Sequence, residues 1–171
     1  MFGSISGIVH ASDARLKKAL SDHEELAGSI TAARSLYLAA LDEKIVREEV
    51  DPLSKDLHDF LWLKIGRQPT ECLVAIFVDR HRGFIACDLV STGSMLELSF
   101  PLESLFSRAF ELNAKGMVLA HNHPSGACEP SVQDIVQSER IARSAGELGI
   151  ELIDHLIVGD EITSMQSVGW L

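Results

Sequence analysis

Two histidines separated by one residue are followed at fixed intervals by a serine and an aspartate, and this pattern constrains the fold more than any other feature. His121 and His123 come directly after the apolar run Met117–Ala120, and the pattern His-x-His-x7-Ser-x2-Asp continues to Ser131 and Asp134. A short apolar run bounded by turn residues is typical of a buried strand. Successive side chains of a strand point to opposite faces. We therefore expect a buried strand that presents both imidazoles on one side of its end.

The segment after the histidines supplies a carboxylate. A proline and a glycine predict a loop, and Ser131 is expected to begin a helix because apolar residues follow it at helical spacing. These apolar residues are Val132, Ile135, Val136, Ala142, Ala145 and Leu148. Asp134 falls in the first turn, where its carboxylate can face back toward the strand end. Two nitrogens and one oxygen suit a tetrahedral zinc with a fourth position open to water, so we predict that His121, His123 and Asp134 bind Zn²⁺.

Each part of this pattern also has a structural interpretation. A single His-x-His is more often a pair of core or surface histidines than a pair of ligands. Ser131 and Asp134 have the spacing of a capping box, which stabilises a helix start without any chemistry. The four residues together, with fixed gaps, favour the metal site.

The same residues resemble the JAMM signature of JAB/MPN metalloprotease domains. The neighbouring segments Leu119–Gly126, Leu152–Asp160 and Ser167–Leu171 resemble the RadC branch of that family. The resemblance extends over residues 53–171 and implies a JAB/MPN-like, cytidine-deaminase-like architecture. We accordingly expect an α+β (mixed) fold with a central mixed β-sheet flanked by helices, preceded by a helical N-terminal segment in residues 1–52.

The resemblance also implies an activity. It implies zinc-dependent hydrolysis of a peptide or isopeptide amide bond in a peptide or protein-conjugate substrate. Glu71 would be the general base, and Ser131 would donate a hydrogen bond to the oxyanion. Spacing alone does not separate Glu71 from Glu97 or Glu103; the resemblance selects Glu71. Nothing in the sequence names the substrate.

The expected elements of residues 53–171 alternate irregularly. Ser54 is predicted to cap a short helix, and Cys72–Val78 reads as a strand buried on both faces. A hairpin turn is expected at residues 79–83, followed by strands near 84–90, 151–158 and 161–166 and helices at 101–114 and 131–149. The polar stretch Thr92–Glu97 is either an exposed edge to which an extended substrate adds as a strand or an ordinary loop.

The N-terminal segment resembles the latter part of a helix-hairpin-helix region. A short helix is expected from Phe2, a second N-cap near Ser12, and then a long amphipathic helix on Ile30, Ala33, Tyr37, Ala40, Leu41 and Ile45. Such hairpins bind phosphate through glycine-supported backbone amides, whereas Ser21–Glu25 adds negative charge here. We interpret the segment as a degenerate remnant that serves packing or docking.

Two further residues could belong to the site. His155, on an expected strand, is either a hydrogen-bonded core histidine, which we favour, or a residue that orients a metal ligand. Cys128 lies between the histidines and Ser131, and we favour a bystander thiol over a fourth ligand because three ligands already satisfy a catalytic zinc. Cys72, Cys87 and Cys128 are expected to be reduced thiols, since three cysteines without paired spacing do not form a disulfide framework.

Composition limits the other classes of function. The chain has 15 basic and 25 acidic residues, a net charge of −10, so nucleic-acid binding is disfavoured, although a DNA-repair or DNA-binding RadC-like protein without hydrolase activity remains the alternative. A zinc nucleobase deaminase would need His-x-Glu followed by Pro-Cys-x-x-Cys, and no Pro-Cys-x-x-Cys occurs. We expect no membrane anchor or signal peptide and a cytoplasmic location. A homo-oligomer stays open.

Overall fold

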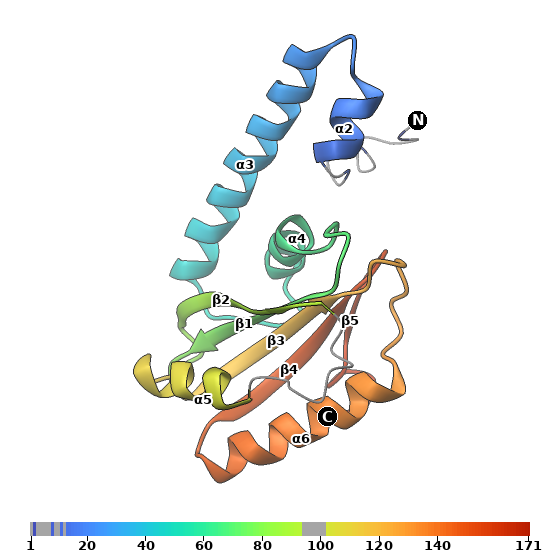
Figure 1. The fold of residues 1–171 in the computed structure, drawn as a ribbon. Coiled ribbons are helices and arrows are strands. Elements are labelled where there is room, and N and C mark those ends of the chain that lie inside the picture. Colours follow the sequence, from blue (N-terminus) through green and yellow to red (C-terminus); the bar gives the residue numbers. More distant parts are fainter. Residues whose placement is uncertain (1, 3–7, 9–10, 12, 94–101) are drawn as a thin grey trace.

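The computed structural model of the protein describes residues 2, 8, 11, 13–93 and 102–171, which form a mixed sheet with helices on both faces (Figure 1). The five strands lie in the order β2-β1-β3-β4-β5. β1 (Cys72–Val78) pairs antiparallel with β2 (Phe84–Thr92) and with β3 (Gly116–Asn122). β4 (Glu151–Val158) lies parallel to β3, and β5 (Ile162–Ser164) pairs antiparallel with β4. This arrangement confirms the predicted α+β fold with a central mixed sheet.

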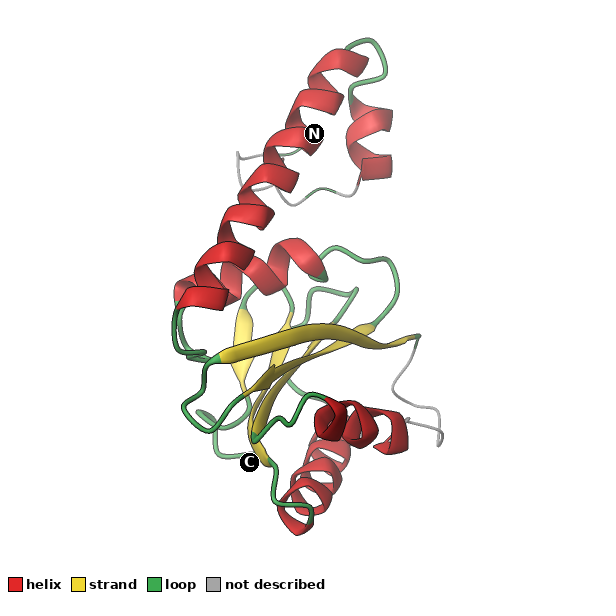
Figure 2. Ribbon diagram, turned by 90° about the vertical axis from the view of Figure 1, so that its left-hand side faces the viewer, coloured by secondary structure: helices red, strands yellow, loops and turns green. Residues whose placement is uncertain are grey.

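The helices divide the buried residues into two cores, one on each face of the sheet (Figure 2). On one face, α4 (Lys55–Lys64) and the end of α3 (Glu24–Arg47) pack on the sheet and form what we call the α4-side core. On the other face, α5 (Leu102–Glu111) and α6 (Val132–Glu147) form the α6-side core. Burial on both faces explains why β1 and β3 consist almost entirely of apolar residues.

Side-chain alternation along β3 decides where the histidines point. Val118 and Ala120 belong to the α4-side core, whereas Met117 and Leu119 belong to the α6-side core. Because side chains two residues apart share a face of a strand, His121 continues the second set and faces α6. The predicted strand before the histidines is confirmed, and the candidate metal ligands lie on the α6 side.

Several local predictions are confirmed. Ser54 caps α4 by accepting the N–H of Leu57. The turn at residues 79–83 connects β1 to β2, and Oδ1 of Asp79 accepts the N–H groups of His81 and Gly83. β1 is buried along its whole length, as predicted for Cys72–Val78.

The predicted buried face of α6 is partly wrong. Val132 and Val136 are 80% and 56% exposed, and Leu148, just after the helix, is exposed as well. The helix buries Ala145, as predicted, but also Asp134, Ser138 and Ile141, which the predicted face did not include. The first two turns of α6 therefore turn polar side chains inward, toward the histidines, and leave apolar ones outside.

The long N-terminal helix is present, but most of its predicted apolar face is exposed. α3 leads from α2 (Asp13–Ala19) to the sheet and projects away from it (Figure 1). Leu41 and Ile45 are buried in the α4-side core, whereas Tyr37 is 45% exposed and Ala33 and Ala40 are exposed. Only the last part of the helix reaches the sheet, which explains the burial of Leu41 and Ile45; Ala27, near the start of the helix, is buried as well.

Some predictions concern residues outside the described ranges. The short helix expected from Phe2, Ser12 as an N-cap, and most of the stretch Thr92–Glu97 are among them. Among the described residues, no helix combines the length and the apolar character needed to cross a membrane.

Candidate metal centre

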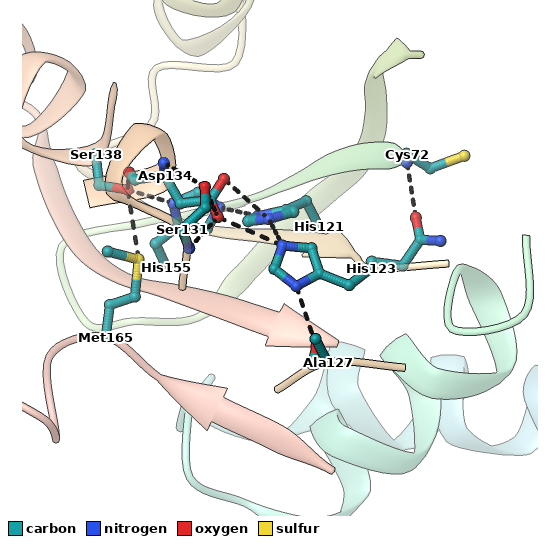
Figure 3. Close-up of polar contacts among 10 residues, drawn as sticks. Cys72, His121, His123, Ala127, Ser131, Asp134, Ser138, His155 and Met165 are labelled. Carbon is teal, nitrogen blue, oxygen red and sulfur yellow. Dashed lines mark hydrogen bonds and ion pairs between the residues drawn. The ribbon is translucent and has the colours of Figure 1, made fainter. Parts of the chain in front are cut away.

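The structure brings together the three residues predicted to bind metal. One ligand atom each from His121, His123 and Asp134 lies within 4.8 Å of the others. Nε2 of His121 is 3.0 Å from Nε2 of His123 and 3.2 Å from Oδ1 of Asp134, and Nε2 of His123 is 3.4 Å from Oδ2 of Asp134. Figure 3 shows the two rings, from the end of β3, pointing at the carboxylate at the start of α6.

These distances and donor types fit a zinc ion. Ligand atoms placed about 2.0–2.2 Å from zinc in tetrahedral directions lie roughly 3.3–3.5 Å apart. The distance between the two Nε2 atoms, and the distance from each of them to one oxygen of Asp134, are close to this value. Two imidazole nitrogens and a carboxylate are also a ligand set that zinc uses in catalytic sites. The cluster is therefore able to hold a metal ion with three protein ligands.

Hydrogen bonds on the far side of each imidazole orient the two rings. Nδ1 of His123 lies 3.0 Å from the carbonyl oxygen of Ala127. Since a carbonyl can only accept, Nδ1 carries a hydrogen, and in the neutral ring Nε2 is then left with a lone pair that can bind a metal. Nδ1 of His121 lies 2.8 Å from Nε2 of His155 on the neighbouring strand β4. Both candidate ligands thus direct Nε2 at Asp134.

The capping box predicted for Ser131 and Asp134 is present. The Ser131 hydroxyl accepts the N–H of Asp134, and Oδ2 of Asp134 accepts the N–H of Ser131 at 2.7 Å and its hydroxyl at 2.6 Å. The structural and the chemical interpretations of this pair are therefore compatible, because the cap itself holds the carboxylate in front of the histidines.

The charges of the cluster are strongly coupled. Burial by itself raises the pKa of Asp134, but hydrogen bonds and charge from His121, together with hydrogen bonds from His123 and Ser131, hold that pKa far below its usual range. The hydrogen bond with Asp134 raises the pKa of His123 despite partial burial, and the charge of Glu71 acts in the same direction. Asp134 is therefore an anion that attracts either protons on the imidazoles or a cation in their place.

Glu71 lies at the same site. It immediately precedes β1 and lines a cleft of about 800 Å³ together with His123, Ser131 and Asp134. Glu103, one of the alternatives open from spacing alone, is exposed on α5 and does not line this cleft, and Glu97 is outside the described residues. The role of general base for Glu71 stays a prediction, which this location supports.

Asn122 holds the segment that carries Glu71, a role that no sequence pattern indicated. Its Oδ1 accepts the N–H of Cys72 at 2.7 Å, and its Nδ2 donates to the carbonyls of Thr70 at 3.2 Å and Gln68 at 3.3 Å. The side chain is fully buried. One amide between the two candidate histidines thus bonds the backbone on both sides of Glu71.

Two other buried polar residues adjoin the ligands. His155 is fully buried and hydrogen-bonded, as the favoured interpretation expected, and one of its partners is His121, the contact that the alternative interpretation requires. Ser138, which sequence reasoning missed, lies 2.6 Å from Nδ1 of His155. Burial lowers the pKa of His155 well below its usual value. The only local signal for Ser138 is that it follows Asp134 by one helical turn, which places both on one face of α6.

Cys128 is not part of the candidate metal cluster. Its thiol donates to the carbonyl of Gly126, and its sulfur accepts the N–H of Glu161. The cluster found among the described residues comprises His121, His123 and Asp134 alone. These contacts agree with the interpretation of Cys128 as a bystander thiol rather than a fourth ligand.

Comparisons with known proteins identify the family of this chain. The RadC-like JAB domain model matches residues 52–170. The UPF0758 protein of Paraburkholderia phytofirmans is 32% identical over 178 residues, which cover 99% of this chain and 66% of the relative. UPF0758 proteins of Chromobacterium violaceum and a Polaromonas species are 31% and 28% identical, each covering 99% of this chain and 76% of the relative. This chain thus spans about two thirds to three quarters of these relatives, and it belongs to the family of RadC-like JAB domains.

Proposed function

We propose that this protein is a zinc-dependent hydrolase of the JAMM type that cleaves an amide bond in a peptide or a protein conjugate. The observation that carries the proposal is the cleft in which Glu71 and Ser131 lie beside the cluster of His121, His123 and Asp134. A metal site alone would also suit a structural role, but a structural zinc is usually enclosed by four protein ligands. Here two of the three candidate ligands, His123 and Asp134, line an open cleft.

His121, His123 and Asp134 would hold the zinc ion. When bound, zinc supplies a Lewis acid that lowers the pKa of a coordinated water toward neutrality. Glu71 would accept the proton from the attacking water and pass it to the leaving amine. The Asn122 amide would keep Glu71 in place by holding the backbone on either side of it.

Ser131 would act on the carbonyl oxygen of the substrate. Its hydroxyl donates to Asp134 in the resting structure. We infer that it turns from the carboxylate to the substrate oxygen as negative charge develops there, when a donated hydrogen bond gains most strength. The N-terminal end of α6 lies at the same place, and its partial positive charge favours an oxyanion.

The cleft also presents apolar surface. Val132 and Val136 lie one helical turn apart on α6, are exposed, and line the cleft next to Pro124. Exposed apolar side chains beside polar reactive groups are typical of a surface that receives a ligand. This composition supports a peptide-like substrate with an apolar side chain near the scissile bond.

Metal analysis combined with a peptide and isopeptide substrate screen tests the proposal. We expect about one zinc ion per chain in the intact protein, hydrolysis that stops when zinc is chelated, and loss of both zinc and activity in His123→Ala. Full zinc occupancy in His123→Ala would refute the ligand assignment. DNA affinity with a steep salt dependence, and no hydrolysis of any amide, would favour the DNA-binding alternative instead.

A further inference from the structure

A chain of buried polar groups runs behind the candidate metal ligands, on the side away from the cleft. It starts at Nδ1 of His121 and passes through the ring of His155 and the hydroxyl of Ser138 to the backbone carbonyl of Asp134 (Figure 3). The three contacts measure 2.8, 2.6 and 2.6 Å. His155 and Ser138 are 0% exposed, so solvent does not complete their hydrogen bonds.

The direction of hydrogen bonding in this chain follows from its last member. The carbonyl of Asp134 can only accept, so it takes the single hydrogen of the Ser138 hydroxyl. The other contact of that hydroxyl, Sδ of Met165 at 3.5 Å, is longer and involves a weaker acceptor. Oγ of Ser138 must then accept from Nδ1 of His155. A neutral imidazole has one N–H, so Nε2 of His155 is bare and accepts from Nδ1 of His121.

This direction of hydrogen bonding determines which nitrogen of His121 is free to bind a metal. With its hydrogen on Nδ1, His121 has an unprotonated Nε2, the atom that lies 3.2 Å from Oδ1 of Asp134 and faces His123. A metal ligand must be unprotonated at the binding atom. If the Ser138 hydrogen pointed to His155 instead, the bond to the Asp134 carbonyl would be lost, both contacts of His155 would reverse direction, and Nε2 of His121 would carry the hydrogen.

We propose that His155 and Ser138 are positioning residues that hold His121 in the tautomer and orientation needed to bind zinc. The chain also joins two of the proposed ligands, because it begins on the ring of His121 and ends on the backbone of Asp134. It therefore fixes β3 and α6 relative to each other at the metal. This inference rests on the proposed function only for its metal site and is independent of any substrate.

A purely structural role for the pair predicts different results. Buried histidine and serine side chains that only fill and satisfy the core would cost stability when replaced, without a specific effect on metal binding. The measurements must therefore separate folding from metal affinity. Ser54→Ala provides the matched control, since it removes a serine cap on α4, next to the opposite face of the sheet from the candidate site.

The first experiment measures zinc affinity by competition with a chromophoric chelator, and the visible absorption of the cobalt-loaded protein. We expect His155→Leu to weaken zinc binding by about 10–100-fold and to change the cobalt spectrum, the usual scale for residues that orient metal ligands. Ser138→Ala should change both in the same direction. His155→Gln should recover part of the affinity, because its side-chain oxygen can still accept from His121. Ser54→Ala should leave affinity and spectrum unchanged.

The outcomes separate this inference from the proposed function. Wild-type protein that binds neither zinc nor cobalt would overturn both. Wild-type metal binding together with wild-type affinity and spectrum in Ser138→Ala and His155→Leu would overturn the positioning role alone. Where His155→Leu does not fold, Ser138→Ala decides, since it removes a single oxygen atom.

The second experiment reads the tautomers directly. Long-range ¹H–¹⁵N correlation spectra of the zinc-loaded protein with ¹⁵N-labelled histidine should show the hydrogen on Nδ1 of both His121 and His155. A hydrogen on Nε2 of His155 in that spectrum would contradict the proposed direction of the chain.

Discussion

Glu71 and Asp134 are both acidic residues of the same cleft, but their surroundings suit them to different tasks. Asp134 is buried, held by Ser131 and faced by two imidazoles, and its pKa is far below the usual range. Such a carboxylate is a good cation ligand and a poor proton acceptor. Glu71 lines the cleft from the segment just before β1, whereas Asp134 lies on α6, and Glu71 is not part of the ligand cluster. This separation underlies the assignment of Glu71 as general base.

Replacing Glu71 with glutamine tests that assignment. The change keeps the shape of the side chain and removes its ability to accept a proton. We expect zinc content to stay at the wild-type level and hydrolysis to fall by about a hundredfold or more. Unchanged activity in Glu71→Gln, with activity abolished in Glu97→Gln, would show that the base is a different glutamate.

Ser131 carries two predicted roles with different numerical demands. As the N-cap of α6, its replacement by alanine should cost about 1 kcal/mol of stability. If the Ser131 hydroxyl is the oxyanion donor, its replacement by alanine should lower kcat by about a hundredfold or more with zinc still bound. We expect both effects in Ser131→Ala, measured as melting temperature, zinc content and kcat. A destabilised variant with wild-type kcat would leave only the cap.

At the scale of elements, the end of β3 serves the site on both faces. The side chain of His121 points to the α6 side of the sheet and belongs to the candidate metal cluster. Asn122 is buried and bonds the backbone before β1. Because successive side chains of a strand alternate, adjacent residues of one strand can hold the metal and position the proposed base.

Asn122→Ala should therefore affect catalysis more than metal binding. Removing the amide leaves the N–H of Cys72 and the carbonyls of Gln68 and Thr70 without this partner, at about 1–3 kcal/mol for each group that stays buried and unsatisfied. We expect a lower melting temperature, retained zinc, and a kcat reduced by about tenfold or more, since a misplacement of about 1 Å can cost about a hundredfold. Wild-type kcat in the folded variant would contradict a positioning role for Asn122.

At the scale of the whole molecule, a metal ion at the site would tie the sheet to α6. A ligand that binds only the folded state stabilises it by mass action, by about 2.7 kcal/mol at a free concentration of about 100 times Kd. We expect chelation to lower the melting temperature of the wild-type protein and to have no effect on His123→Ala. An equal shift in both would mean that the chelator acts elsewhere.

The N-terminal segment is also joined to the rest of the molecule through its core. Ile45 on α3 is 6% exposed and belongs to the α4-side core, whereas the next residue, Val46, is 53% exposed. Ile45→Ala should destabilise the protein by about 2–5 kcal/mol, and Val46→Ala should change stability by no more than about 0.5 kcal/mol. Chemical denaturation measures both. Equal small effects would show that α3 contributes little to the fold.

The sequence alone determined the features that depend on local periodicity. The apolar run of β1, the strand before His121 and the helix starting at Ser131 follow from spacing, and the His-x-His-x7-Ser-x2-Asp pattern predicted which side chains meet. The helical period of α6 was predicted correctly, but the buried face of its first two turns was not. Its first turns bury Asp134 and Ser138 because those residues face polar partners on the sheet, and a rule that turns apolar residues inward assigns the opposite face.

Only the tertiary structure decided which residues support the site. His155 reaches His121 because β4 lies parallel beside β3, with Leu119 opposite His155, and Ser138 reaches His155 because α6 crosses that same face. Asn122 reaches Cys72 through the pairing of β1 with β3, across 50 residues of chain. These contacts depend on strand order and helix placement, which arise from packing of the whole chain. Local sequence spacing contains no information about these contacts. His155 is buried, as the sequence interpretation expected, but only the structure shows that it is hydrogen-bonded to the candidate ligand His121.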